Sequence, residues 1–281
     1  MDEIAIISDI HGNVPALEVV LEDIHQRGIE EIYCLGDLVG KGPESAQAVD
    51  LCQKNCEGIV QGNWDEFIQQ PTTKESRLWH QRQLGNDRMA YLAALPGVID
   101  LTLSGQHLRL YHASQENVHH RVYYWEPYEK LQAMFENTPF TGEFIDKDED
   151  VNRDAHEEQM KSDRNRGGTS NLRAQPDVVI YGDIHHAFML PVNGNLLINA
   201  GSVGNPCDGI PMASYLIVKG EKGKSLTTTG TPISVEFVRQ PFDIEGAIAI
   251  ARHAEMPRLA EYAFELRHGR YRRHMPEGYV P

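Results

Sequence analysis

Seven acidic, amide and imidazole residues in this sequence each follow closely on a short apolar run. The apolar runs, IAIIS, IYCL, GIV, LRLY and DVVIY, are rich in Ile, Val, Leu and Tyr, a pattern that predicts buried strands. Because loops at the carboxyl ends of strands in open α/β sheets meet in one crevice, we expect these residues to surround one or two ions. The set favours a two-metal hydrolase site. Its members are Asp9 and His11 in SDIHGN, Asp37 in LGDLVGKGP, Asn63 in QGNWDE, His112 in YHAS, and Asp183 and His185 in YGDIHH.

The elements that must position these residues alternate between strands and helices, which predicts an α/β fold. Asn13 and Pro15 predict the start of a helix that runs to about Gly28, since Asn caps helices well and Pro suits the first turn. The other expected elements are helices after Pro43 and at 76–94, 243–253 and 257–267, a hairpin of residues 97–103 and 108–111, and later strands in DVVIY, NLLIN, SYLIV and ISVEFV.

Residues 114–175 interrupt this alternation. The segment is polar, aromatic at first, and contains the charge runs DKDED and KSDRNRGG. Because it is too long for an ordinary loop, we expect an inserted cap or lid within a single domain that spans residues 1–281. The alternative for residues 146–171 is a solvated, partly disordered excursion.

The composition limits the possible partners. With 281 residues and 41% hydrophobic content, the chain is long enough to bury a sizeable core. A formal net charge of -15 disfavours binding to duplex nucleic acid. No apolar stretch approaches the roughly 18–20 residues that span a bilayer, so we expect no membrane insertion. The start lacks a secretory signal pattern and the four cysteines form no CxxC pair, so a cytoplasmic location is expected. The sequence leaves the oligomeric state open.

Five sequence blocks resemble the metal-binding motifs of the calcineurin-like metallophosphoesterases. The blocks are D-x-H-G-N, G-D-x-x-x-x-G-P, G-N-x-D, H-A-S and G-x-x-H, in this order, and the resemblance spans about residues 3–112 and 177–267. It implies a four-layer α-β-β-α sandwich of two mixed sheets, with the site at one edge.

The resemblance also implies a ligand set for two divalent ions, Mn²⁺ or Fe, which accept carboxylate, amide and imidazole ligands together. Asp37 would bridge the ions, and a hydroxide shared by them would attack phosphorus in line. Asn63 and Asp65 are further candidate catalytic residues. Asp9, His11 and His185 would complete the first ion site, and Asn63, His112 and Asp183 the second.

The residue after Asn63 departs from the family pattern. Related sequences usually carry His there, whereas this chain carries Trp64, so the usual proton donor to the leaving group is missing. Without that acid, alkoxide leaving groups react poorly, whereas anhydrides and aryl esters release anions that are already stable. Trp64 could also stack on a base. We therefore expect a nucleotide-type anhydride or diester substrate, such as diadenosine tetraphosphate.

A second departure is Asp183, where the family pattern has His. With Asp9 and Asp37 it places three carboxylates around two ions, which should favour Mn²⁺ over Zn²⁺. The alternative is that Asp183 turns away or orients His185 as a hydrogen-bond acceptor.

Four further residues are candidates for substrate binding. Ser202 and Asn205 lie in a Gly-rich loop that could present backbone N–H groups to phosphate, although simple turn chemistry is an alternative. Arg121 and Tyr124 belong to a cationic and aromatic cluster at 119–125 that suits a nucleotide. The alternative for that cluster is a packed interface beneath a cap.

The preferred function is therefore a dinuclear metal-dependent phosphoesterase acting on a phosphorylated small molecule or nucleotide. Two other functions remain open. A serine/threonine protein phosphatase would share the same blocks, and a catalytically silent metal-binding scaffold would use the fold to bind protein partners.

Overall fold

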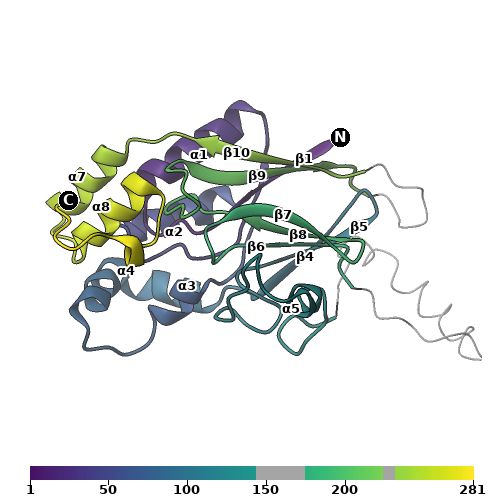
Figure 1. The fold of residues 1–281 in the computed structure, drawn as a ribbon, viewed down its shortest axis with the longest axis horizontal. Coiled ribbons are helices and arrows are strands. Elements are labelled where there is room, and N and C mark those ends of the chain that lie inside the picture. Colours follow the sequence, from purple (N-terminus) through teal and green to yellow (C-terminus); the bar gives the residue numbers. More distant parts are fainter. Residues whose placement is uncertain (144–174, 224–231) are drawn as a thin grey trace, which may run out of the picture.

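The computed structural model describes residues 1–143, 175–223 and 232–281, and within these ranges two mixed sheets of five strands lie face to face (Figure 1). The first sheet has the order β10-β9-β1-β2-β3 and the second the order β4-β5-β6-β8-β7. The strands of the first sheet are β1 (Asp2–Ile7), β2 (Glu31–Cys34), β3 (Gly58–Ile59), β9 (Ala213–Gly220) and β10 (Ser234–Gln240). Those of the second are β4 (Val98–Leu103), β5 (Gln106–Tyr111), β6 (Val178–Tyr181), β7 (Ala187–Val192) and β8 (Asn195–Ala200).

Helices cover the outer faces of the two sheets, so the predicted four-layer α/β sandwich is confirmed. Helices α1 and α2 cover the first sheet, and α5 covers the second (Figure 1). Helices α7 and α8 lie at the end of the molecule opposite the N-terminus (Figure 1). The described helices are α1 (Val14–Gln26), α2 (Ser45–Asn55), α3 (Asn63–Phe67), α4 (Glu75–Ala93), α5 (Tyr128–Ala133), α7 (Ile244–His253), α8 (Leu259–His268) and the 3-10 turn η2 (Arg272–His274).

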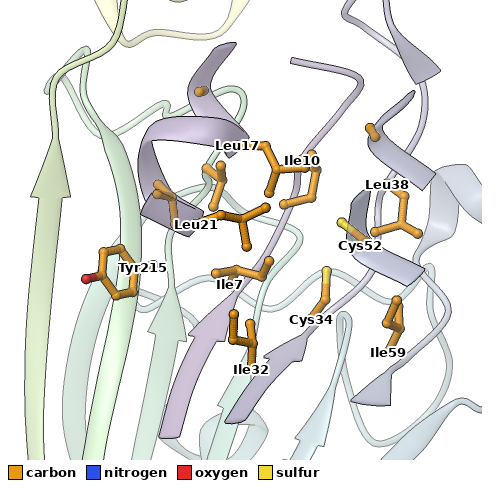
Figure 2. Close-up of a cluster of buried hydrophobic side chains, with 14 of the residues drawn as sticks. Ile7, Ile10, Leu17, Leu21, Ile32, Cys34, Leu38, Cys52, Ile59 and Tyr215 are labelled. Atoms are coloured by element: carbon orange, nitrogen blue, oxygen red, sulfur yellow. The ribbon is translucent and has the colours of Figure 1, made fainter. Parts of the chain in front are cut away.

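The continuous apolar runs become central strands that are buried on both faces. In β1, Ile4 and Ile6 point into the core between the sheets, whereas Ala5 and Ile7 point toward the helices. Successive side chains of a strand face opposite sides, so a strand enclosed on both faces needs an unbroken apolar sequence. Figure 2 shows Ile7 near Leu21 of α1, within the outer cluster.

The predicted caps and turns fix the ends of the elements. The Asn13 side chain accepts a hydrogen bond from the Ala16 backbone N–H at 3.3 Å, which caps α1 as expected. The predicted hairpin forms as β4 and β5, and its turn residues Ser104 and Gly105 both have positive φ. Helix α4 contains Gly85 with φ 67°, so it is kinked rather than continuous.

Four elements lie in segments to which the sequence patterns assigned no helix or strand: α3, α5, β7 and η2. Helix α3 is a single turn of five residues, too short to display a helical periodicity. Strand β7 is an edge strand with a partly exposed face, so its sequence lacks the apolar run of a buried strand.

The described part of the predicted insertion packs onto the outer face of the second sheet. Leu131, Met134 and Phe135 share a buried cluster with Tyr111 and Tyr181. The hydroxyl of Tyr181 donates to the Val122 carbonyl at 2.7 Å. Residues 144–174, which include the stretch 146–171 considered above, lie outside the described residues. No described helix is both long enough and apolar enough to cross a membrane.

A buried ion pair links the two strands of the β4–β5 hairpin, and a hydrogen bond from the same arginine joins the hairpin to the segment that follows α5. Arg109 is fully buried and donates to both carboxylate oxygens of Asp100 at 2.8 Å and to the Asn137 side chain at 2.7 Å. Removing one partner of such a pair leaves an uncompensated buried charge, which typically costs about 3–5 kcal/mol.

We therefore predict that Arg109→Ala lowers the free energy of unfolding by about 3–5 kcal/mol in urea denaturation. Arg88 makes the same two-point contact with Asp50 at the surface, so Arg88→Ala is the matched control. That control should cost no more than about 1 kcal/mol. Equal costs for the two variants would contradict the prediction.

Candidate metal centre and active site

The candidate ligands lie at the carboxyl ends of parallel strands from both sheets. Strands β1, β2 and β3 run parallel in the first sheet, and β5, β6 and β8 run parallel in the second. The segments after these strands carry every candidate ligand found in the sequence. The two sheets therefore deliver their polar loops to one edge of the sandwich, as strand-end convergence predicts.

Close contact between these loops requires glycine at two positions. A Cβ on Gly62 would overlap the backbone of Asp37, and one on Gly182 would lie 2.6 Å from Asp9 Oδ2. Both glycines directly precede the segments of candidate ligands. Their missing side chains let the β2 and β3 loops, and the β1 and β6 loops, approach within contact distance.

Five candidate ligands have left-handed backbone conformations. Non-glycine residues rarely adopt positive φ, which costs about 1–2 kcal/mol per residue, and such strain is concentrated at functional sites. These residues are Asp9 (φ 54°), His11 (51°), Asp37 (55°), Asp183 (62°) and His185 (54°).

Three imidazoles are oriented by backbone carbonyls. The Nδ1 atoms of His11, His112 and His185 lie 3.2, 2.7 and 2.5 Å from the carbonyl oxygens of Val39, Leu35 and Asn205. Since a carbonyl only accepts hydrogen bonds, each Nδ1 carries a proton, and Nε2 is the atom that presents a lone pair when the ring is neutral. The three Nε2 atoms are thus prepared to act as metal ligands, in the manner of carbonyl-oriented histidines.

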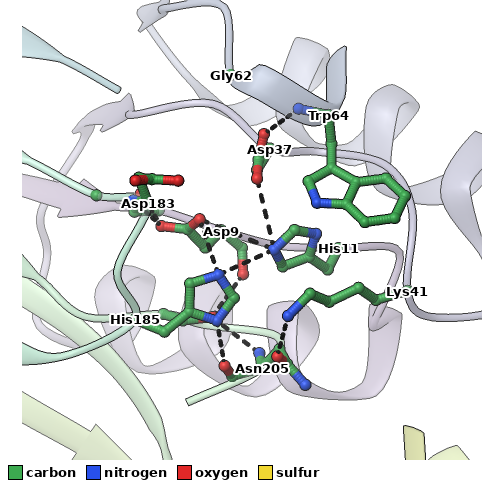
Figure 3. Close-up of polar contacts among 12 residues, drawn as sticks. Asp9, His11, Asp37, Lys41, Gly62, Trp64, Asp183, His185 and Asn205 are labelled. Carbon is green, nitrogen blue, oxygen red and sulfur yellow. Dashed lines mark hydrogen bonds and ion pairs between the residues drawn. The ribbon is translucent and has the colours of Figure 1, made fainter. Parts of the chain in front are cut away.

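The lone pairs of these imidazoles converge on two aspartates. His185 Nε2 and His11 Nε2 lie 3.2 and 3.8 Å from Asp9 Oδ1 (Figure 3). Asp37 Oδ2 lies 3.6 Å from His11 Nε2, and Asp37 Oδ1 lies 3.5 Å from His112 Nε2. Asp37 therefore presents one oxygen toward each side of the cluster, as a bridging carboxylate would. Two groups of three have the mutual spacing of metal ligands: Asp9, His11 and His185; and Asp9, Asp37 and His112.

Two buried atoms of the cluster have no hydrogen-bond partner among the described residues. They are Asp9 Oδ1 and His112 Nε2. The other oxygen of Asp9 accepts from the Ser8 hydroxyl at 2.6 Å and the Asp183 N–H at 3.1 Å. Because leaving a buried polar atom unpaired costs free energy, these two atoms fit divalent cations.

The shifted pKa values in the buried cluster indicate a site that binds positive charge. Burial raises the pKa of Asp37 well above its usual value, and His112 only partly opposes this effect. Burial alone would lower the pKa of His112, but the carboxylates of Asp37, Asp9 and Asp183 raise it to about 9. Burial would raise the pKa of Asp9, but the adjacent His185 lowers it below its usual value. Protons therefore neutralise part of this cluster, and metal ions would replace them.

Asp183 is held by two side chains from other segments. Arg121 donates to both of its oxygens, at 2.8 and 2.7 Å, and Asn63 Nδ2 donates to Oδ1 at 2.7 Å. Asp183 Oδ1 also lies 3.8 Å from His112 Nε2, so Asp183 and Asn63 border the second group of candidate ligands. The positive charge of Arg121 offsets the extra carboxylate that distinguishes this chain from the family pattern.

Several predicted site residues lie behind the cluster rather than in a cleft. Asp65 is fully buried and accepts from the N–H groups of Asp37, Leu38 and Gly62 at 2.8, 2.9 and 2.9 Å. It therefore fixes the turn that carries Asp37.

The two polar residues of the Gly-rich loop are fully buried. Ser202 donates to the Asp9 carbonyl at 2.8 Å, and its hydroxyl accepts from the Asn205 N–H at 2.8 Å. The Asn205 side chain accepts from Lys41 at 2.6 Å (Figure 3). In this arrangement Ser202 and Asn205 support the ligands.

A cleft of about 310 Å³ opens beside the cluster and is lined by Asp37, His185 and Trp64. The indole of Trp64 lies edge-on to His11 with ring centroids 5.9 Å apart. It occupies the space over Gly40, where any Cβ would overlap the ring.

The cationic walls of the cleft include residues that the sequence patterns did not single out. Lys41 lies between Glu265, at 3.6 Å, and the ring of Tyr271, whose centroid is 5.6 Å from Nζ. Arg272 and Arg273 also line the cleft. The sequence could have indicated these arginines, because they belong to a run of basic residues near the C-terminus of an otherwise acidic chain.

The aromatic cluster at 119–125 lies at the rim. Tyr124 is 43% exposed and stacks on His186 with ring centroids 5.8 Å apart. Tyr123 lines the cleft and stacks on Trp125 at 4.5 Å. Of the predicted substrate-binding residues, only Trp64 and Arg121 are among those that line this cleft.

The two mixed sheets with outer helices form the α/β sandwich fold of metallophosphoesterases. Residues 3–137 match the model of the calcineurin-like phosphoesterase superfamily domain. The chain is 30% identical over 260 residues to an uncharacterized protein of Methanocaldococcus jannaschii, covering 87% of this chain and 89% of that relative. The chain belongs to the calcineurin-like phosphoesterase superfamily, a family of hydrolases.

Two solved structures resemble the fold. A metallophosphoesterase from Sphaerobacter thermophilus is 23% identical, with a TM-score of 0.60, over 95% of this chain and 99% of that one. A hypothetical protein from Pyrococcus horikoshii is 17% identical, with a TM-score of 0.68, over 96% of this chain and 100% of that one. At these identities the likeness extends to the fold alone.

We predict that Asp9→Ala abolishes the stabilisation that Mn²⁺ gives the folded protein, because Asp9 belongs to both groups of candidate ligands. For the unaltered chain, Mn²⁺ at 100 times its dissociation constant should raise the free energy of unfolding by about 2.7 kcal/mol for each site. The measurement is thermal unfolding of chelator-treated protein with and without Mn²⁺, together with metal content by mass spectrometry. His112→Ala should retain one ion, and an unchanged metal content in the Asp9 variant would contradict the assignment.

Proposed function

We propose that this protein hydrolyses phosphoanhydride or phosphodiester bonds in a small nucleotide-type substrate, with a dinucleoside polyphosphate such as diadenosine tetraphosphate as the leading candidate. One observation carries the proposal. Three carbonyl-oriented Nε2 atoms and the oxygens of Asp9 and Asp37 face one another in a buried cluster that borders a cationic cleft. Side chains prepared to bind metal next to a cleft suited to anions support metal-dependent chemistry on phosphate.

The proposed ligands are assigned to two divalent ions, Mn²⁺ or Fe. Asp9, His11 and His185 would hold one ion, His112, Asn63 and Asp183 would hold the other, and Asp37 would contact both. Asp9 also has the spacing of a ligand relative to Asp37 and His112, so its loss would weaken both ion sites. When bound, such ions withdraw charge from phosphoryl oxygens and lower the pKa of an attacking water.

The residues of the chain itself would bind and orient the substrate. Lys41 is anchored by Asn205 and Glu265, so its ammonium group is held at the cleft wall, where it would attract the phosphoryl group. The positive charge of Arg121 is already engaged by Asp183, so its role is to hold that carboxylate beside His112. Asp65 is a positioning residue for Asp37.

The leaving group is constrained by Trp64. Its indole fills the position from which an imidazole would otherwise donate a proton, and indole N–H is not an acid at neutral pH. Hydrolysis should therefore be efficient only for leaving groups that are stable as anions, such as a nucleotide phosphate or an aryl oxide. This constraint argues against phosphoserine and phosphothreonine proteins as substrates.

We predict that the protein hydrolyses bis-p-nitrophenyl phosphate when Mn²⁺ is added, and that Asp37→Ala lowers kcat/KM on the order of 1000-fold. Absorbance of released p-nitrophenolate measures the rate. Asp50→Ala, which removes an exposed carboxylate on α2, is the matched control and should keep its activity. A protein that binds Mn²⁺ but hydrolyses neither this ester nor diadenosine tetraphosphate would instead support a scaffold.

We also predict that Trp64→His raises kcat/KM for phosphoserine about 100-fold, because it introduces a general acid beside the leaving group. The rate for p-nitrophenyl phosphate should change little, since its leaving group needs no proton. Trp64→Phe removes the indole without adding an acid and is the control. If both variants change kcat/KM for the two substrates by the same factor, protonation of the leaving group does not limit the hydrolysis of phosphoserine.

A further inference from the structure

A short basic segment near the C-terminus borders the cleft, although no motif in the sequence includes it. Residues 270–274 have the sequence Arg-Tyr-Arg-Arg-His and follow α8. They lie beyond residues 3–137, which match the superfamily domain.

Hydrogen bonds fix this segment against the site. The hydroxyl of Tyr271 donates to the carbonyl of Ile184 at 2.7 Å, and Ile184 lies between Asp183 and His185 in the chain. The backbone N–H of Arg272 donates to Glu265 Oε1 at 3.0 Å. The backbone beneath the arginines is therefore anchored to the ligand loop and to α8.

The guanidinium groups of this segment are not neutralised by the protein. Within residues 1–143, 175–223 and 232–281, neither Arg272 nor Arg273 forms an ion pair with a carboxylate, although the chain has a net charge of -15. The Arg273 guanidinium lies 5.3 Å from the centroid of the Tyr271 ring, and its Nε donates to His274 at 3.2 Å. By contrast, Arg267 on the preceding helix is paired with Glu245. Exposed arginines that lack a carboxylate partner beside a cleft remain available for an anion from solution.

The two arginines extend the cleft in two directions. Arg272 lines both the cleft and a neighbouring hollow of about 270 Å³, to which Lys74 and Arg77 also contribute. Arg273 lines both the cleft and another hollow of about 320 Å³, together with Arg270 and Trp125. A phosphoryl group at the candidate ligands Asp37 and His185 would occupy the inner wall of the cleft. Phosphates attached to it would lie farther out, where these arginines are found.

We propose that Arg272 and Arg273 form a second anion subsite, which binds the phosphates next to the scissile one in a substrate with two or more consecutive phosphates. This inference rests on the proposed function, because it takes the Asp37 and His185 side of the cleft as the place of reaction. According to this inference, residues 270–274, which lie outside the family motifs, make the protein bind polyphosphates more tightly than monophosphates.

The test compares the affinities of inorganic tripolyphosphate and orthophosphate for the full-length protein. Their inhibition constants are measured against hydrolysis of bis-p-nitrophenyl phosphate at constant free Mn²⁺. Calorimetry on chelator-treated protein measures the same two affinities without turnover. We expect the unaltered protein to prefer tripolyphosphate, and the double variant Arg272→Ala/Arg273→Ala to lose about tenfold or more of that preference in both measurements.

Two further variants separate charge from structure. Arg82→Ala/Arg252→Ala removes two positive charges from residues that line none of the three hollows, and it should keep the full preference. Arg272→Lys/Arg273→Lys keeps the charge and should recover most of the preference. The inference is overturned if the unaltered protein has no preference, if the control pair loses as much as the alanine pair, or if lysine restores nothing.

The two proposals can fail separately. Absence of hydrolysis with Mn²⁺ would remove the proposed function, whereas the calorimetric preference would still decide the anion subsite. Hydrolysis without any preference for tripolyphosphate would remove the subsite and leave the phosphoesterase. Near-UV circular dichroism of each variant verifies that it is folded.

Discussion

The site depends on three hydrogen bonds that turn imidazoles toward a common point. His11, His112 and His185 each direct Nδ1 at a backbone carbonyl, so their Nε2 atoms face inward. Two of the acceptors, Leu35 and Val39, flank the candidate ligand Asp37 in the chain, and the third, Asn205, lies in the loop that follows β8. The imidazoles are therefore oriented by the fold before any ion or substrate arrives, which is the preorganisation that metal sites require.

The same residues have features that reduce the stability of the folded state, so the rest of the structure must stabilise them. Five candidate ligands occupy left-handed backbone conformations, and the charged ones are almost completely buried. Each of these features is unfavourable in isolation. The two close-packed sheets and the loop contacts at Gly62 and Gly182 hold the ligand loops in place, so the large core supplies the stability that the site lacks.

Much of the fold followed from the sequence because its strongest signals are local. The apolar runs, the Asn13 cap and the hairpin around Gly105 predicted elements that the structure contains. The order of the five motif blocks predicted which side chains gather at one edge. Single-turn α3 and edge strand β7 were missed because neither has the periodicity or the continuous apolar sequence on which such predictions depend.

The finer organisation of the site could not be predicted, because it depends on pairs of residues far apart in the chain. Nothing in the sequence near Asp183 indicates that Arg121, 62 residues earlier, takes both of its oxygens. Similarly, Asp65 belongs to a sequence motif, but only in the folded structure do its carboxylate oxygens accept hydrogen bonds from backbone N–H groups behind Asp37. Ser202 and Asn205 lie in a loop that suits phosphate by composition, yet both side chains are buried as supports.

The hydrogen bond from Tyr271 to the Ile184 carbonyl makes the last part of the chain a structural component of the ligand loop. Displacement of the final dozen residues, by a fused peptide or by proteolysis, would therefore reach Asp183 and His185 directly. The N-terminus lies at the far end of the molecule (Figure 1). Purification tags and labels intended to leave the site undisturbed belong at that end.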